Sequence, residues 1–146
     1  MKRIQTIIFD LDGVLARDGE TRFFIEETPP NYAAFNNAIG SVAPVVEMFK
    51  MAQALYAQGY KIAVYTARSF EVFNTTRTWL DGHGLGFAEL IMRPCGNTWP
   101  DWKIKKEMAH VALMTGEDII LAVENCQECI EMYKSLGIPT LKVSYE

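Results

Sequence analysis

Five short, almost continuously apolar runs alternate with helical stretches along this chain, and that alternation limits the possible folds more than any other feature. The runs cover residues 4–9, 60–65, 87–92, 119–123 and 138–143. Strands of this composition are buried on both faces, as in parallel sheets. Helical patterns cover residues 42–58, 70–81, 102–114 and 125–136, and a glycine follows three of them. This order predicts an α/β fold: a doubly wound, Rossmann-like sheet of five parallel strands with right-handed crossovers.

The expected strand order also predicts where a ligand binds. Ligands of such sheets bind at the carboxyl ends of the strands, beside the point where strand order reverses. If the first strand is central, with the second and third on one side and the fourth and fifth on the other, that point lies between strands one and four. Asp10 and Glu124 stand at the ends of these two strands, so we expect them to face each other.

Two carboxylates one residue apart, Asp10 and Asp12, stand where the first apolar run stops. An extended backbone sends alternate side chains to the same side, so both can project from the carboxyl end of the strand. Gly13 permits the sharp turn that such a loop needs. A strand that ends in a simple polar turn would show the same residues, but the pair also fits metal-assisted phosphoryl chemistry.

The composition is that of a globular protein with one domain, residues 1–146. Its net charge of −4 argues against a broad surface for duplex nucleic acid, although a nucleic-acid end in a small cleft needs only a few local cations. No apolar run approaches the roughly 20 residues that span a bilayer, and no secretory signal precedes the first strand, so we expect a cytoplasmic location without membrane contact. Packing explains the Cys-x-x-Cys motif of Cys126 and Cys129 better than a redox pair or half a zinc site does.

Residues 15–40 interrupt the alternation of strands and helices. They contain Pro29 and Pro30 and a possible short helix over residues 31–39. We expect a loop-rich excursion over the active end of the sheet, too small for an independent cap domain. The site should therefore be fairly open, with a minimal cap domain or none, which favours large or terminal substrates.

Phosphoryl transfer through a covalent intermediate needs a nucleophile, a proton donor and acceptor, a metal, and groups that hold the phosphate oxygens. Asp10 would attack phosphorus, and Asp12 would protonate the leaving group and later activate water. Thr66 and Arg68 follow the second strand and offer a hydroxyl and a guanidinium to a phosphate, although Arg68 could instead form a salt bridge across the cleft. Glu124 ends the fourth strand as a hard oxygen ligand suited to Mg²⁺.

Residues 10–14, Thr66, a downstream lysine and Glu124 after an apolar run together resemble the four motifs of the haloacid dehalogenase-like (HAD) phosphatases. Within that superfamily the chain is most similar to the 3'-phosphatase domain of phage polynucleotide kinase-phosphatases. The similar segments, residues 75–80, 91–94, 101–105 and 131–139, are spread over most of the chain.

The resemblance implies a role for each matching residue. Asp10 would be the phosphorylated nucleophile, Asp12 the general acid and base, and Thr66 the hydroxyl that binds the transferring phosphate. Three lysines are near enough to be the lysine of the third motif, and the one with the family's spacing, four residues after Asp101, is preferred: Lys105, over Lys103 and Lys106.

The same resemblance implies binding and metal residues. Those expected to bind substrate or support activity are Thr66, Ala67, Arg68, Asp101 and an arginine after the first motif, either Arg17 or Arg22. Those expected to bind Mg²⁺ are Asp10, Asp12, Glu124 and Asn125.

The fourth motif departs from this branch of the superfamily. Two consecutive aspartates are usual there, whereas this chain has Glu124 and Asn125. Glutamate keeps a charged oxygen on a longer stem, while Asn125 keeps an oxygen acceptor and loses a charge, which would weaken Mg²⁺ binding or the positioning of Lys105. Glu128, four residues after Glu124, could restore an acid.

These residues together predict a Mg²⁺-dependent phosphomonoesterase that works through an aspartyl-phosphate. Its expected substrate is a polynucleotide 3'-phosphate end or a nucleotide, with Trp99 and Trp102 available for contact with a base or ribose. One alternative is a small-molecule or 5'-nucleotide HAD phosphatase. An alternative of another class is a non-catalytic phosphate-binding protein whose fourth motif has decayed.

Overall fold

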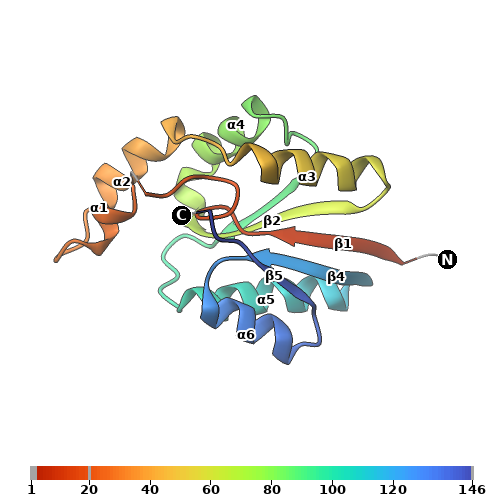
Figure 1. The fold of residues 1–146 in the computed structure, drawn as a ribbon. Helices are drawn as coiled ribbons and strands as arrows, with labels where there is room; N and C mark the ends of the chain where they lie inside the picture. Colours follow the sequence, from red (N-terminus) through yellow and green to blue (C-terminus); the bar gives the residue numbers. More distant parts are fainter. Residues whose placement is uncertain (1–2, 20, 146) are drawn as a thin grey trace.

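In the computed structural model the chain forms a five-stranded parallel sheet of order β3-β2-β1-β4-β5 (Figure 1). The structure describes residues 3–19 and 21–145, without the side chains of Arg22 and Phe23. The strands are β1 (Ile4–Phe9), β2 (Lys61–Ser69), β3 (Glu89–Arg93), β4 (Glu117–Glu124) and β5 (Thr140–Lys142). The predicted fold class and strand order are confirmed, with β1 at the centre.

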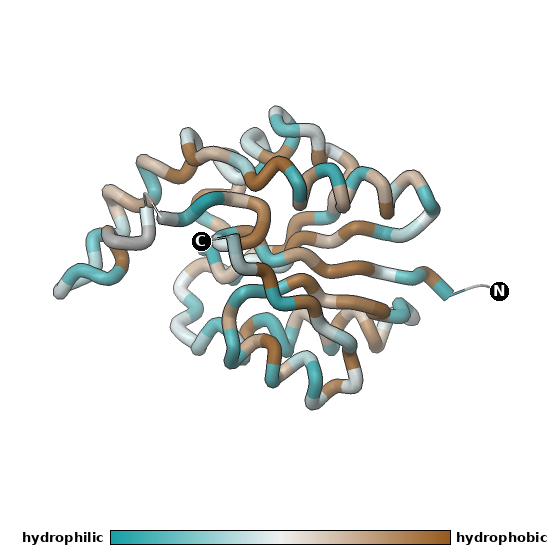
Figure 2. The backbone as a smooth tube through the Cα atoms, viewed as in Figure 1, coloured by the Kyte–Doolittle hydropathy of each residue, from teal (hydrophilic) through white to brown (hydrophobic). Residues whose placement is uncertain are grey.

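Helices cover both faces of the sheet, and each pair of helices packs on its own apolar cluster. Helices α3 (Val46–Ala57) and α4 (Phe73–Gly82) lie on one face, while α5 (Asp101–Met114) and α6 (Gln127–Ser135) lie on the other (Figure 1). Alternate residues of β1 contribute to opposite clusters: Phe9 packs with the first helix pair and Ile8 with the second. Figure 2 shows the strands as the most hydrophobic part of the chain, as expected for strands buried on both faces.

Helix α3 begins later than the sequence pattern predicts, at Val46 rather than at residue 42. The backbone before it is extended and bonds to the loop that follows β1: the Arg17 N–H donates to the Ala43 carbonyl at 2.9 Å, and the Val45 N–H donates to the Leu15 carbonyl at 2.7 Å. Pro44 also disfavours a helical conformation in the residue before it. The long-range hydrogen bonds and this proline together determine where α3 starts.

The segment between β1 and α3 contains more helix than the sequence pattern predicts. Helix α2 (Tyr32–Ala38) lies where a short helix was expected, and the Asn31 side chain caps it by accepting a hydrogen bond from the Ala34 N–H at 3.1 Å. Helix α1 (Arg22–Glu26) was not predicted. Both project beside the end of the sheet toward which β1 points (Figure 1). No helix in the described ranges is long and apolar enough to cross a bilayer.

The strand register brings the first and fourth motifs together. Phe9 pairs with Val64 on one side and with Val123 on the other, and the Asp10 N–H donates to the Val123 carbonyl at 2.9 Å. The loop then turns at Gly13, which has a φ of +87°. A Cβ at Gly13 would lie 1.9 Å from the Asn125 side-chain nitrogen, so the absence of a side chain here lets the two motifs touch.

We expect Gly13→Ala to destabilise the protein more than Gly59→Ala does. Both glycines have positive φ, +87° and +98°, but nothing lies within 4 Å of a Cβ at Gly59. Gly59→Ala should cost about 1–2 kcal/mol for the backbone conformation alone, and Gly13→Ala about 1–3 kcal/mol more for displacing Asn125. Urea unfolding of the two variants measures the difference, and equal losses would contradict the contact.

Candidate active site

A buried lysine lies between two carboxylates at the carboxyl ends of β1 and β4. The Lys105 Nζ of α5 is 2.7 Å from Oδ1 of Asp10 and 2.9 Å from Oε2 of Glu124. All three residues are buried, with Glu124 only 1% exposed. Asp10 and Glu124 therefore approach each other as predicted, and of the three lysines considered, Lys105 is the one that contacts Asp10.

Burial and charge act on these groups in opposite directions. For Lys105, burial lowers the pKa, but the negative charges of Asp10 and Glu124 outweigh it and raise the pKa well above its usual value. For Asp10, burial raises the pKa, Lys105 lowers it and Glu124 raises it, with a net rise. The ammonium of Lys105 is therefore firmly protonated, and it is the positive charge that lets two carboxylates share this buried space.

Asp12 is held by an arginine from the neighbouring strand. Arg68 donates from Nε to Oδ2 of Asp12 at 2.9 Å and from Nη2 to Oδ1 at 2.6 Å, a bidentate pair. Its remaining Nη1 donates to the Thr76 hydroxyl of α4 at 3.2 Å. The structure therefore contains the salt bridge that was the alternative prediction for Arg68.

Thr66 lies on β2 two residues before Arg68. Its Oγ1 accepts a hydrogen bond from the Arg68 N–H at 3.1 Å, and the residue is 1% exposed. The hydroxyl therefore bonds within the irregular last part of β2, where the register with β3 shifts between Thr66 and Ser69. To bind a phosphate, it would use its own hydrogen as donor, which this bond leaves available.

A second arginine, Arg93 at the end of β3, organises the outer wall of the site. It donates from Nε to the Ala67 carbonyl at 2.8 Å and from Nη2 to Asp101 at 2.8 Å. The predicted residues Ala67 and Asp101 are therefore joined through Arg93. Arg93 was not among the residues with a predicted role, although it stands at the end of an apolar run, which was the available signal.

Of the two arginines expected after the first motif, Arg17 has a described side chain, and that side chain contacts Tyr145. Arg17 is exposed, and its guanidinium lies 4.9 Å from the centre of the Tyr145 ring. The Arg22 side chain lies outside the described part of the structure. Glu128, considered as a substitute acid, is exposed on α6. Asn125 lies against Gly13, next to the loop of the first motif.

The expected Mg²⁺ ligands have the right donor chemistry, since carboxylate and amide oxygens suit this ion. In the ranges that the structure describes, however, no three or more His, Cys, Asp or Glu side chains gather as a metal-binding group. Lys105 engages one oxygen each of Asp10 and Glu124, and Arg68 engages both oxygens of Asp12. The donor atoms therefore fit Mg²⁺, and Lys105 and Arg68 contact the carboxylate oxygens that would bind it.

The Cys-x-x-Cys motif begins α6 directly after the fourth motif. The Cys126 N–H donates to Oε1 of Glu124 at 3.2 Å, so the helix start helps to orient that carboxylate. A hydrogen bond with Cys129 is the main cause that lowers the pKa of the Cys126 thiol to about 6. Both thiols are free, and Cys129 is buried in the core.

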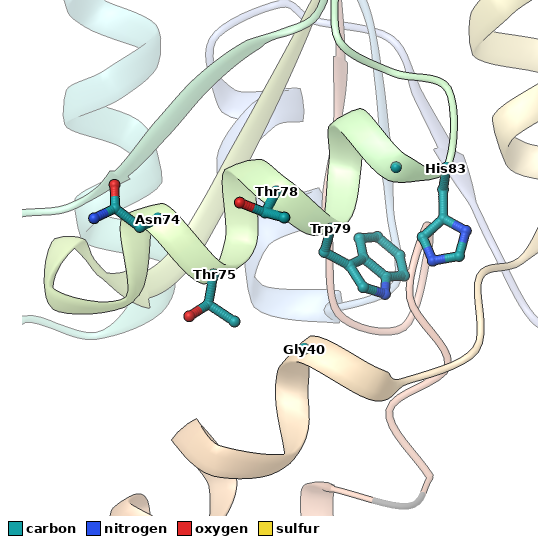
Figure 3. A pocket seen from close by; sticks show the side chains of 7 residues that line it. Gly40, Asn74, Thr75, Thr78, Trp79 and His83 are labelled. Carbon is teal, nitrogen blue, oxygen red and sulfur yellow. The ribbon is translucent and has the colours of Figure 1, made fainter.

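A hollow of about 530 Å³ lies between α4 and the short 3-10 helix η1 (Ile39–Ser41) (Figure 3). The rings of Trp79 and His83 lie against each other, with centroids 4.8 Å apart. None of the residues with a predicted catalytic role lines this hollow. It is lined by Gly40, Asn74, Thr75, Thr78, Trp79, Gly82 and His83.

Comparison with known families shows which family this chain belongs to. The sequence model of the polynucleotide kinase PNKP phosphatase domain, a branch of the HAD-like phosphatases, matches residues 4–146. The chain belongs to the PNKP phosphatase-domain family. It is accordingly an HAD-like phosphatase domain, and the suspected resemblance is confirmed.

Solved structures share the fold at low sequence identity. A chain of the Pnkp1/Rnl/Hen1 RNA repair complex is 19% identical with a TM-score of 0.81, and the match covers 98% of this chain and 43% of that one. The class C acid phosphatase from Bacillus anthracis is 11% identical with a TM-score of 0.65, covering 94% and 63%. A hydrolase from Streptococcus pneumoniae TIGR4 is 13% identical with a TM-score of 0.66, covering 99% and 94%. The PNKP phosphatase-family chain described here thus spans less than half the length of the repair-complex chain.

We expect Lys105→Met to destabilise the protein by about 3–5 kcal/mol, because it leaves two buried carboxylates without their cation. The loss should shrink as pH falls, because burial and the neighbouring Glu124 raise the pKa of Asp10, which is then protonated and neutral in the folded state. Lys106→Met, a neighbouring change on the same helix, should stay within about 0.5 kcal/mol. Denaturant unfolding at several pH values tests this, and a small, pH-independent loss would contradict the buried charge cluster.

Proposed function

We propose that this chain is a Mg²⁺-dependent phosphatase that removes a phosphate from the 3' end of a nucleic acid through an aspartyl-phosphate on Asp10. The observation that carries the proposal is the position of Asp10 at the carboxyl end of the central strand, bonded to Lys105 at 2.7 Å and beside the β2 residues Thr66 and Arg68. Parallel sheets of this kind bind ligands at that end. The family match and the similarity to a chain of an RNA repair complex support a nucleic-acid substrate.

In the first step an oxygen of Asp10 attacks phosphorus, and the bond between phosphorus and the 3' oxygen breaks. Asp12 supplies the proton that the leaving 3' oxygen needs. In the second step Asp12 takes a proton from water, the water oxygen attacks phosphorus, and Asp10 is released with inorganic phosphate. Thr66 and Lys105 would bind the phosphate oxygens.

The bidentate bond to Arg68 holds Asp12 in place and uses one lone pair on each of its oxygens, which leaves a second lone pair on each. Asp12 can therefore exchange a proton while Arg68 holds it, and a guanidinium N–H that leaves Asp12 would be available to a phosphate oxygen. Arg68 would thus position Asp12 before the reaction and bind phosphate during it.

Asp10, Asp12, Glu124 and Asn125 would hold Mg²⁺. When bound, the ion supplies positive charge that reduces repulsion between the phosphate and the carboxylates. Glu124 accepts backbone N–H bonds from both Asn125 and Cys126 at 3.2 Å, so its longer side chain is still held in one orientation. We therefore expect Glu124 and Asn125 to support catalysis in place of the two aspartates.

Turnover of matched phosphorylated compounds tests the proposal. With Mg²⁺, a 3'-phosphorylated single-stranded oligonucleotide should be hydrolysed faster than the same strand with a 5'-phosphate, and excess EDTA should stop the reaction. Asp10→Asn should lower kcat/KM by about 10³-fold or more. Asp118→Asn, at the opposite end of the sheet on β4, should act like the wild type because its only described partner is Arg3 near the surface.

Other outcomes identify the alternatives. Preference for a 5'-nucleotide or a small phosphomonoester would indicate a different substrate for the same chemistry. Phosphate binding without hydrolysis of any of these compounds would overturn the proposal in favour of a phosphate-binding protein.

A further inference from the structure

Two exposed aromatic side chains flank the catalytic end of the sheet on its β2 and β3 side, and the proposed reaction does not use them. Phe70 follows β2 and is 53% exposed, while Trp99 precedes α5 and is 42% exposed. We call these two residues the aromatic rim. Aromatic rings that remain open to water beside a binding site are suited to stacking on planar ligands.

The backbone of Trp99 is fixed to the active site. Its carbonyl accepts a hydrogen bond from Nη1 of Arg93 at 2.6 Å, and its N–H donates to Oδ1 of Asn97 at 3.0 Å. The same guanidinium binds the Ala67 carbonyl and Asp101. Because these bonds fix the backbone of Trp99, a ligand that contacts its ring does not have to order the loop.

Lys103 places a positive charge at this ring. Its Nζ lies 4.4 Å from the centre of the Trp99 ring, while the residue itself is exposed on α5. An aromatic surface next to a solvent-exposed ammonium offers one group for a base and one for a backbone phosphate. This combination is the chemistry that recognises a single nucleic-acid strand.

Both residues of the aromatic rim are close in sequence to residues of the proposed phosphate site. Lys105, which contacts Asp10, is four residues after Asp101, a rise of about 6 Å along α5. Phe70 comes two residues after Arg68, and the intervening Ser69 is in register with Arg93. Phe70 also stacks on Phe73 with centroids 4.9 Å apart, which fixes its ring. Nucleotides next to a terminal phosphate at Asp10 can therefore reach the rim.

We infer that the aromatic rim and Lys103 form a subsite for the unpaired bases next to the terminal 3'-phosphate, so that the protein selects single-stranded ends. The inference rests on the proposed function for the position of that phosphate. The net charge of −4 supports stacking as the main source of affinity, because Lys103 is the one cation assigned to this subsite and the excess of acidic residues gives no overall attraction for phosphates. Binding of a strand should accordingly depend only weakly on salt.

Binding of a short, fluorescently labelled deoxyoligonucleotide with a 3'-hydroxyl tests the subsite without any turnover. In the Asp10→Asn protein, Trp99→Ala should weaken binding about tenfold, the loss of one stacked base, while Trp99→Phe should retain most of the affinity. Tyr56→Ala is the matched control, since this residue is 48% exposed and stacked on Phe87, but lies on α3 before the amino end of β2. Circular dichroism confirms that each variant is folded.

A second measurement separates this inference from the proposed function. With the catalytically intact protein, Trp99→Ala should raise KM for the 3'-phosphorylated strand and lower its kcat/KM relative to that for p-nitrophenyl phosphate. Hydrolysis of the 3'-phosphate with oligonucleotide binding unchanged by Trp99→Ala would overturn the subsite and leave the function standing. Trp99-dependent binding without 3'-phosphate hydrolysis would overturn the function and leave the subsite standing.

Discussion

The ammonium of Lys105 allows the first and fourth motifs to meet inside the protein. Asp10 and Glu124 end adjacent strands, and the register of β1 and β4 puts them together whether or not their charges are balanced. Two buried carboxylates that contact the same side chain repel each other, and Lys105, 2.7 Å from Asp10 and 2.9 Å from Glu124, supplies the compensating charge. Helix α5 carries this lysine, so the packing of α5 on the sheet and the chemistry of the site depend on each other.

A second ion pair prepares the other acid. Arg68 binds both oxygens of Asp12 and is itself braced by Thr76 of α4. The site therefore holds each of its aspartates with a separate cation, Asp10 with Lys105 of α5 and Asp12 with Arg68 of β2. A substrate phosphate would compete with these carboxylates for the same two cations. The groups that hold the aspartates without substrate would therefore also bind the phosphate.

Most of the fold could be predicted from the sequence because its signals are local and repeat. Apolar runs too continuous for one exposed face indicate buried parallel strands, and the same reasoning placed Asp10 opposite Glu124. The start of α3 was predicted wrongly because residues 43–45 bond to the loop after β1, a long-range pairing with no local signal. Helix α1 was missed for a similar reason, since five residues carry too little periodicity to be recognised.

The site residues were predicted from the spacing of their motifs. That spacing could not show which carboxylate or carbonyl each lysine or arginine contacts. Lys105 was preferred over its neighbours because it stands four residues after Asp101 in the sequence, and in the structure it contacts Asp10. The bond between Arg68 and Asp12 was only an alternative, and Arg93 was overlooked, because an arginine at a strand end looks the same in sequence whether it faces water or ties loops together. Geometry alone distinguishes these cases.

The central claim is that Asp10 becomes phosphorylated, and trapping the intermediate tests it most directly. Protein quenched in acid during turnover of a 3'-phosphorylated oligonucleotide would be digested and its peptides analysed by mass spectrometry. The account predicts one phosphate on the peptide that contains Asp10, removed by hydroxylamine as expected for an acyl phosphate, and absent from Asp10→Asn. Steady turnover with no phosphorylated peptide, or with the phosphate on another residue, would contradict it.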